Sequence, residues 1–293
     1  MASQAVAAPR RKLRGTALLG TVPFFAYVTI FLVIPTLVVV IGAFAGDDGG
    51  VSFANVKALT NDYILDAFGR SIVLSAVSAV IGAIGGALLA YALVTSKAGG
   101  VLRRVVTSAA GVLAQFGGVT LAFAFLATIG LSGFVTVWLK DHLSIDLYAN
   151  GVWLFELPGL ILIYTYFQIP LMLIVFLPAL DGIRPQWREA CESLGATTWQ
   201  YWTRVAGPLL APAFLGSTLL LFANAFSAYA TAAALVSQGS PIIPLQIRGA
   251  LTSEVVLGQQ NLGKAMALGM VIVVAVVMGL YSLLERRTAK WLG

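Results

Sequence analysis

The sequence predicts an all-α, polytopic membrane protein with six transmembrane helices and a long cytoplasmic loop between helices four and five. Three observations favour this class: a high apolar content, six apolar runs of spanning length, and an uneven distribution of Lys and Arg. Hydrophobic residues make up 59% of the 293 residues and charged residues only 10%, and the mean hydropathy is +0.92. Soluble domains are about 25% charged, and a soluble globule could not bury so much apolar surface. A soluble enzyme, a disordered chain and a disulfide scaffold are therefore disfavoured.

The apolar runs define the expected spans. A transmembrane helix needs about 20 mostly apolar residues, and six segments qualify: residues 17–45, 71–95, 105–129, 152–177, 208–236 and 263–284. The first run is too long, and too interrupted by Pro23 and Pro35, for a cleaved signal peptide. Alternating strands of about 10 residues, typical of a β-barrel, are not seen. We therefore expect one membrane domain over residues 17–285, with a basic tail at residues 1–16 and a short tail at residues 286–293.

The basic residues predict the orientation, because Lys and Arg concentrate in cytoplasmic segments. With the N-terminus inside, most of the 18 basic residues are cytoplasmic: Arg10, Arg11, Lys12, Arg14, Lys97, Arg103, Arg104, Arg184, Arg188, Arg204, Arg286, Arg287 and Lys290. Only Lys57, Arg70, Lys140, Arg248 and Lys264 remain outside. Both termini are thus expected in the cytoplasm. The net charge of +6 is explained by topology and does not indicate binding to nucleic acid.

Several kinds of chemistry are disfavoured by what the chain lacks. One cysteine permits no internal disulfide, and the single histidine, His142, argues against a histidine-based metal site or proton relay. His142 is flanked by charges in an outer loop, where a solvated side chain is expected. We therefore expect no catalytic residues, no metal and no cofactor.

The loop at residues 181–207 carries the most information. Pro185 suits the first turn of a helix. Trp187, Ala190, Cys191 and Leu194 then follow at i, i+3, i+4 and i+7, which predicts one apolar helix face. Gly195 suits a helix end with positive φ, and Thr197 with Gln200 predicts a capping box that opens a second helix. Such a pair of helices can dock in a protein groove or lie on the lipid interface, and the pattern alone leaves both open.

This loop resembles the EAA loop of binding-protein-dependent ABC importer permeases. The family pattern is roughly Glu-Ala-Ala, three residues, Gly, nine residues, Ile, one residue and Leu-Pro. The chain has Glu189-Ala190-Cys191, Gly195, Val205 and Pro208 at the matching positions. It departs at Cys191, which replaces a second Ala but is also small and apolar when buried, and at Gly207, which replaces Leu.

The resemblance implies a set of partners. The loop would form coupling helices in a cleft of an ATP-hydrolysing subunit, with Glu189 as the charged anchor and Gly195 as the turn between the helices. The implied coupling residues are Trp187, Glu189, Ala190, Cys191, Leu194 and Gly195. Because the chain has no Gly-x-x-x-x-Gly-Lys-Ser/Thr phosphate loop, ATP hydrolysis is expected on two separate ATPase subunits. A second permease, identical or related, and an extracytoplasmic binding protein complete the expected assembly in a bacterial cell membrane.

Polar residues inside spans are candidates for the substrate pathway, since exposing them to lipid is costly. Gln115, Gln168 and Asn224 are the main ones. Gln168 lies beside Pro170, where a broken helix could open backbone to a cavity. Asn224 is equally compatible with a hydrogen bond between helices. Glu156 is a further candidate near the outer face, where it either simply reaches water or has a role with the substrate.

The outer segment 237–248, with Ala228 to Thr231 before it, is similar to the polyamine, iron and phosphonate branch of these permeases, with the sugar branch as competitor. Two other classes remain as alternatives to an ATP-driven importer. A secondary transporter driven by an ion gradient favours intramembrane carboxylates and inverted repeats, of which the sequence offers only Glu156 and no repeat. A membrane scaffold that does not transport would need no polar residues in its spans.

Overall fold

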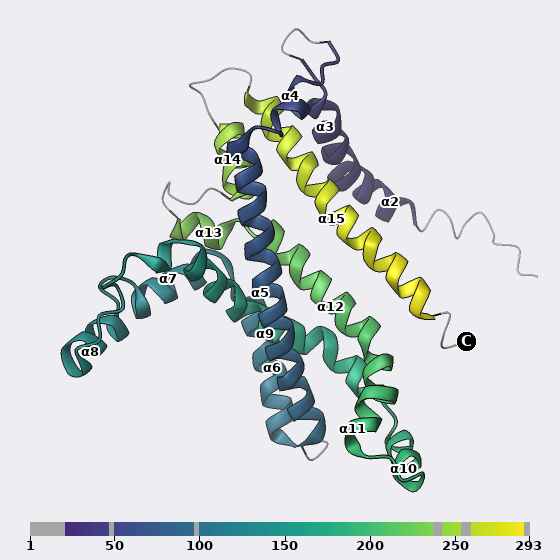
Figure 1. Ribbon diagram of the computed structural model, residues 1–293. Coiled ribbons are helices and arrows are strands. Elements are labelled where there is room, and N and C mark those ends of the chain that lie inside the picture. Colours follow the sequence, from purple (N-terminus) through teal and green to yellow (C-terminus); the bar gives the residue numbers. More distant parts are fainter. Residues whose placement is uncertain (1–20, 47–49, 97–99, 237–241, 253–258, 290–293) are drawn as a thin grey trace, which may run out of the picture.

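The computed structural model describes residues 21–46, 50–96, 100–236, 242–252 and 259–289. Six helical segments of this part are long and apolar enough to cross a membrane, which confirms the all-α, six-span fold class. The expected basic tail at residues 1–16, together with Lys97, Lys290 and residues 237–241 of the outer segment, lies outside the described residues. Figure 1 shows α10 and α11 at one end of the molecule and α4 and α14 at the other.

The first span is helical throughout but changes its winding. It consists of α2 (Val22–Val28), a π-helical turn η1 (Thr29–Val33) and α3 (Ile34–Ala43). Pro23 stands in the first turn of α2, where the missing N–H costs least, whereas Pro35 follows directly on the π-helical turn inside the continuous helix. The span packs mainly against α15 (Gln259–Ala289), and its end lies beside α4 (Figure 1). Lys264 of α15 packs against Gly42 of α3 and donates to the side-chain oxygen of Asn261 at 3.1 Å.

The spine of the fold is the pair α5 (Asp62–Thr95) and α9 (Leu157–Asp181). The buried face of α5 is a stripe of small residues, namely Ala67, Ser71, Ser75, Ser78, Ala79, Gly82, Ala83, Gly86 and Ala90. A Cβ on Gly86 would lie 2.5 Å from the Ile169 carbonyl oxygen, and one on Gly82 would lie 2.6 Å from Gln168 Cβ. Small residues at a spacing of four let two membrane helices approach closely, so α5 lies almost backbone to backbone on α9.

Both spine helices differ from the sequence prediction at their ends. Helix α5 begins at Asp62, nine residues before the predicted span at 71, because its polar first turns continue the helix beyond the apolar run. Helix α9 runs from Leu157 without interruption through Pro170 and Pro178 to Asp181. The sequence suggested a break at Pro170, but Pro170 is buried inside a continuous helix. Neighbouring helices can accommodate proline in a membrane helix by satisfying or covering the freed backbone groups.

The third and fifth predicted spans are not single helices. Residues 105–129 fall in α6 (Val101–Gln115) and α7 (Gly118–Ile129), which are separated at Phe116 and Gly117, and Gly118 opens α7 with φ +70°. The third candidate span of the structure is Gly118–Leu143, so the predicted bounds of this span were wrong. Residues 208–236 form α12 (Gly207–Ser227) and α13 (Ala230–Leu235), which are separated at Ala228 by extended backbone. An apolar run reports burial in the membrane but not the φ angle at one residue, so the sequence missed both breaks.

The remaining helices connect these spans. They include α4 (Ala54–Ala58), α8 (Phe134–Leu143), the short 3-10 turn η2 (Trp153–Phe155) and α14 (Ile243–Thr252). The loop between the fourth and fifth spans contains α10 (Pro185–Ser193), and α11 (Thr198–Tyr201) and the π-helical turn η3 (Trp202–Ala206) follow it. Helix α14 is fastened to α5 because the Ile243 amide donates to Ser71 Oγ at 2.9 Å. Helix α15 is fastened to α12 because the Tyr281 hydroxyl donates to the Pro212 carbonyl at 2.8 Å.

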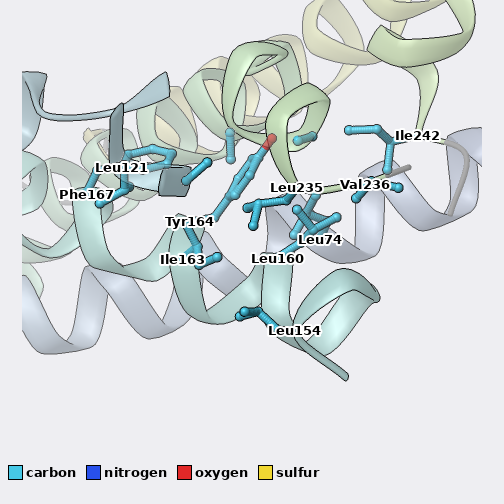
Figure 2. Packing of buried hydrophobic residues seen from close by; sticks show 13 residues of the cluster. Leu74, Leu121, Leu154, Leu160, Ile163, Tyr164, Phe167, Leu235, Val236 and Ile242 are labelled. Atoms are coloured by element: carbon cyan, nitrogen blue, oxygen red, sulfur yellow. The ribbon is translucent and has the colours of Figure 1, made fainter. Parts of the chain in front are cut away.

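One hydrophobic cluster joins residues of α5, α7, α9, α12 and α13. Figure 2 shows Tyr164 of α9 among Leu160, Ile163 and Leu235, with its hydroxyl directed away from Leu154. That hydroxyl donates to the carbonyl oxygen of Ala228 at 2.7 Å. The carbonyls at a helix end lack partners within the helix, so Tyr164 stabilises the break after α12 from inside the core.

The close contact between α5 and α9 makes a stability prediction. Gly86→Leu should lower the thermal unfolding midpoint of the purified chain in detergent, because the added side chain meets the α9 backbone. Overpacking of this kind costs about 1–3 kcal/mol. Gly69→Leu is the matched control on the same helix, where a Cβ meets no atom within 4 Å, and it should stay within about 0.5 kcal/mol of wild type. Equal midpoints for the two variants would contradict this packing.

Candidate functional site

The loop at residues 181–207 folds as two short helices joined at Gly195. Helix α10 ends in a Schellman motif: the Ala196 amide donates to the Cys191 carbonyl at 2.9 Å, and the Gly195 amide donates to the Glu192 carbonyl at 3.0 Å. Gly195 has φ +77°, which confirms the expected positive φ. The capping box is also present, because Thr197 Oγ1 accepts from the Gln200 amide while Gln200 Oε1 accepts from the Thr197 amide.

Most of the surface of this loop is exposed. None of the residues of α10 is buried, and the side chain of Leu194 is 87% exposed. Trp187 and Cys191 are half-buried, whereas Ala190 is exposed. The carboxylate of Glu189 is exposed and has no ion pair or hydrogen bond with any residue in the described part of the chain. Arg188, by contrast, is engaged by Glu192 at 2.9 Å.

A pocket of about 340 Å³ lies between the two short helices. Leu194 and Gly195 line it from the end of α10, and Gln200, Tyr201 and Arg204 line it from α11 and η3. An exposed leucine next to a pocket and an unpaired carboxylate can together receive a complementary protein surface with one basic group. The loop therefore exposes a two-helix unit with a pocket between its helices, and residues 181–207 are called the docking unit below, after the role expected from the sequence.

The same loop is anchored to the membrane helices. Arg103 at the start of α6 pairs with Asp181 at the end of α9, and the ring of Trp202 packs edge-on against Tyr91 of α5 at 5.3 Å between centroids. Helices α11, η3 and α12 follow one another without a gap, which makes one rod from Thr198 to Ser227. A displacement of the docking unit must therefore move α12.

At its far end this rod reaches the two helix breaks. A Cβ on Gly118, at the break between α6 and α7, would lie 3.5 Å from the Cβ of Ala230, which opens α13. The two breaks are thus adjacent in space although they lie more than a hundred residues apart in sequence. Irregular backbone at membrane depth is tolerated where it is buried in protein or lines a water-filled cavity.

The predicted pathway residues fall in two different places. Gln115 ends α6 just before the first break, and Asn224 lies one turn before the second, and both are exposed. Gln168 instead is 0% exposed. Its amide oxygen accepts from Ser78 Oγ at 2.8 Å, and its amide nitrogen donates to the Leu221 carbonyl at 3.1 Å. Gln168 therefore links α9 to α5 and α12, whereas Gln115 and Asn224 stand beside the paired breaks.

The other weighed residues lie at the surface. Glu156 is exposed at the start of α9 and makes no capping bond there. His142 is exposed on α8, where its ring stacks on Trp138 and its Nδ1 lies 3.1 Å from the Trp138 carbonyl oxygen. Among the described residues, neither Glu156 nor His142 makes a hydrogen bond or ring contact with Gln115 or Asn224.

Sequence reasoning missed two residues at the second break. Tyr229 separates α12 from α13, and Arg248 of α14 donates a hydrogen bond to its hydroxyl oxygen. The two residues are 19 positions apart and share no local motif. The signal that was available is that Arg248 is one of only a few basic residues assigned to the outer side.

Comparisons with known proteins agree with this architecture. The profile of the family described as binding-protein-dependent transport system inner membrane component matches residues 119–290. The sulfate transport system permease protein CysT of Escherichia coli (strain K12) is 26% identical over 224 residues, which cover 75% of this chain and 74% of that protein. The putative ferric transport system permease protein FbpB 1 of Haemophilus influenzae is 26% identical over 66% of this chain, although the match covers only 30% of the longer relative.

A solved structure shares the fold over nearly the whole chain. It is the crystal structure of a bacterial ABC transporter involved in the import of the acidic polysaccharide alginate, with a TM-score of 0.75 and 20% identity. The match covers 94% of this chain and 96% of that chain. Since the family match includes more than half of the residues, the chain belongs to the binding-protein-dependent transport system inner membrane component family and is a multi-pass permease subunit of an ABC importer.

Proposed function

We propose that this subunit forms part of the translocation pathway for a small solute delivered by an extracytoplasmic binding protein. Two separate ATPase subunits drive the transport, and they act on the permease through the docking unit at residues 181–207. The observation that carries the proposal is an exposed two-helix unit with an unpaired Glu189 on its first helix. Its second helix, α11, continues without a gap into a membrane helix that ends at the paired breaks.

The coupling mechanism follows from this continuity. An ATPase subunit that holds α10 and the pocket between the short helices displaces the start of the rod from Thr198 to Ser227. The other end of the rod is Ala228, whose carbonyl is held by Tyr164. The rod is helical from Thr198 to Ser227, with a π-helical turn at η3, and its regular hydrogen bonding ends at the break. Motion of the docking unit is therefore transmitted along the rod to the break. Glu189 supplies the unpaired charge of the docking surface. The shape of that surface is set by Trp187, Ala190, Cys191, Leu194 and Gly195.

A second permease subunit, identical or related, closes the pathway. In a single chain Gln115 and Asn224 are exposed at membrane depth, which is costly in lipid. A facing subunit or the water of a shared pathway removes that cost. Gln168 takes a positioning role in this scheme, because its buried amide fixes α9 against α5 and α12.

The solute is a small ion or a small organic molecule. The resemblance of the outer segment favours a polyamine, iron or phosphonate-like solute, with sugars second. The names of the relatives support ions first: they are permeases for sulfate, ferric iron and molybdenum. One relative is a probable permease for starch degradation products, which keeps the sugar branch as the alternative.

The orientation in the bacterial membrane places both termini in the cytoplasm. Arg103 at the start of α6 and Arg184, Arg188 and Arg204 of the docking unit share one end of the molecule, which supports a cytoplasmic face there. Reporter fusions test the orientation. A fusion at Gly293 should report the cytoplasm and a fusion at Asp141 the outside, and the same side for both would contradict the six-span topology.

Variants of Glu189 and Gly195 test the docking unit. Glu189→Ala should reduce co-purification of the ATPase, because loss of one desolvated charge partner typically costs about 2–5 kcal/mol. Gly195→Val should have a similar effect through the backbone, since a β-branched residue resists φ +77°. Uptake should fall in both variants, while membrane insertion and the unfolding midpoint of the permease should stay near wild type.

Two matched controls separate docking from general damage. Glu156→Ala removes an exposed carboxylate at the opposite end, and Gly279→Val adds a branched side chain where a Cβ meets no atom within 4 Å. Both should bind the ATPase like wild type. Wild-type ATPase association and uptake in Glu189→Ala and Gly195→Val together would show that the loop is not the coupling site.

The energy source distinguishes this proposal from an ion-gradient transporter. Vesicles with the permease pair, the ATPase and the binding protein should accumulate solute only when ATP is supplied. Vesicles with this chain alone and an imposed proton or sodium gradient should accumulate none. Accumulation in the second preparation would favour the secondary transporter instead.

A further inference from the structure

A cationic side chain stands at the break between α12 and α13. Arg248 extends from the exposed face of α14, whose opposite face is held by buried Ile243 and Ala250. Its guanidinium carbon lies 5.7 Å from the centroid of the Tyr229 ring, and its Nη1 donates to the Tyr229 hydroxyl oxygen. Tyr229 thus holds the Arg248 guanidinium next to the end of the rod from Thr198 to Ser227.

This cation has no counter-charge in the described part of the chain. The ion pairs found there join Arg103 with Asp181, Lys140 with Asp146 and Arg188 with Glu192. Helices α7, α12, α13 and α14 contain no Asp or Glu. The guanidinium carries five N–H groups in a planar fork, and only one of them is used by Tyr229. The remaining donors are available to a ligand.

Neutral polar groups also lie at the end of the rod, just before Tyr229. Asn224 and Ser227 are spaced i and i+3, so they share one face of α12, and both are exposed. The Asn224 side chain makes no hydrogen bond with another described residue, so its two N–H groups are free to donate. The Ser227 hydroxyl is bonded to the Ala223 carbonyl at 3.0 Å. This face of α12 therefore carries two exposed polar side chains and no carboxylate, and it ends two residues before Tyr229, which holds Arg248.

We propose that Arg248, positioned by Tyr229, forms an anion-binding site at the outer end of the translocation pathway, and that the transported solute is an oxyanion. The proposal rests on the proposed function, because it names the solute class of that pathway. A planar guanidinium binds two oxygens of one oxyanion at once. A polyamine or a ferric ion would meet a like charge at Arg248, and a neutral sugar would leave its charge unpaired. Among the three favoured solutes, only the phosphonate-like class satisfies this site.

The test uses the complete transporter, with the permease pair, the ATPase and the binding protein, in vesicles. The probes are radiolabelled sulfate, molybdate, phosphate and methylphosphonate against ferric iron, spermidine and maltose. An oxyanion should accumulate with ATP. Arg248→Gln should reduce its uptake about ten- to a hundredfold, as expected for the loss of charge-assisted hydrogen bonds. Arg248→Lys should retain more uptake than Arg248→Gln, because it keeps the charge.

Three further variants separate binding from structure. Tyr229→Phe keeps the ring but removes the hydroxyl that positions the guanidinium, so it should reduce uptake less than Arg248→Gln. Arg70→Gln removes an exposed arginine of α5 and should transport like wild type. Glu254, the next charged residue along the chain, lies outside the described residues, and Glu254→Gln should also transport like wild type. Co-purification of the ATPase should be unchanged in all of these variants.

The outcomes distinguish this inference from the proposed function. ATP-dependent uptake of spermidine, ferric iron or maltose in place of an oxyanion would overturn the anion site and leave the importer function intact. Wild-type oxyanion uptake by Arg248→Gln, or an equal loss in Glu254→Gln, would also overturn it, the latter because Arg248 would then act through an internal ion pair. Gradient-driven uptake by the chain alone would instead overturn the proposed function.

Discussion

The close approach of α5 and α9 is the contact on which the rest of the structure depends. Gly82 and Gly86 have no side chains, so the α5 backbone reaches the α9 backbone around Ile169. That approach encloses the Gln168 amide between Ser78 and Leu221. A buried amide is costly unless it is hydrogen-bonded, and membrane helices gain no hydrophobic driving force from packing against one another. Small-residue packing and one satisfied amide therefore fix α5, α9 and α12 together.

This rigid centre determines where the molecule can deform. Helix α9 leads into the docking unit, and α12 leads out of it toward the paired breaks. Gln168 lies near the middle of α9 and bonds to Leu221 in the last third of α12, so the two helices are held together close to the second break. The irregular backbone at Gly118 and Ala228 is where regular helical hydrogen bonding is already absent. Motion is least costly there, and the exposed polar residues Gln115 and Asn224 are at the same places.

The sequence predicts what depends on averages and on local rules. Spans are averages over about 20 residues, so their number was predicted correctly, although the bounds of the third were not. The helix end at Gly195 and the capping box at Thr197 depend on only a few neighbours and were also predicted correctly. The breaks depend on single φ angles inside apolar runs, and hydropathy does not report φ. The environment of Gln168 depends on Ser78 of α5, which is 90 positions away in the sequence. A spacing rule could have found that partner, because Gly82 and Gly86 form the pattern of small residues four apart.

The position of Arg248 suits passage of a solute better than tight retention. A transport site must bind well enough to admit a solute and weakly enough to release it. Arg248 is exposed, and Tyr229 already engages its guanidinium through the ring face and the hydroxyl. Both features weaken the binding of an incoming oxyanion, because solvent screens the charge of Arg248 and one of its donors is already occupied. The affinity that selects the solute then resides in the binding protein, while the pathway requires only that its charge is of the right sign.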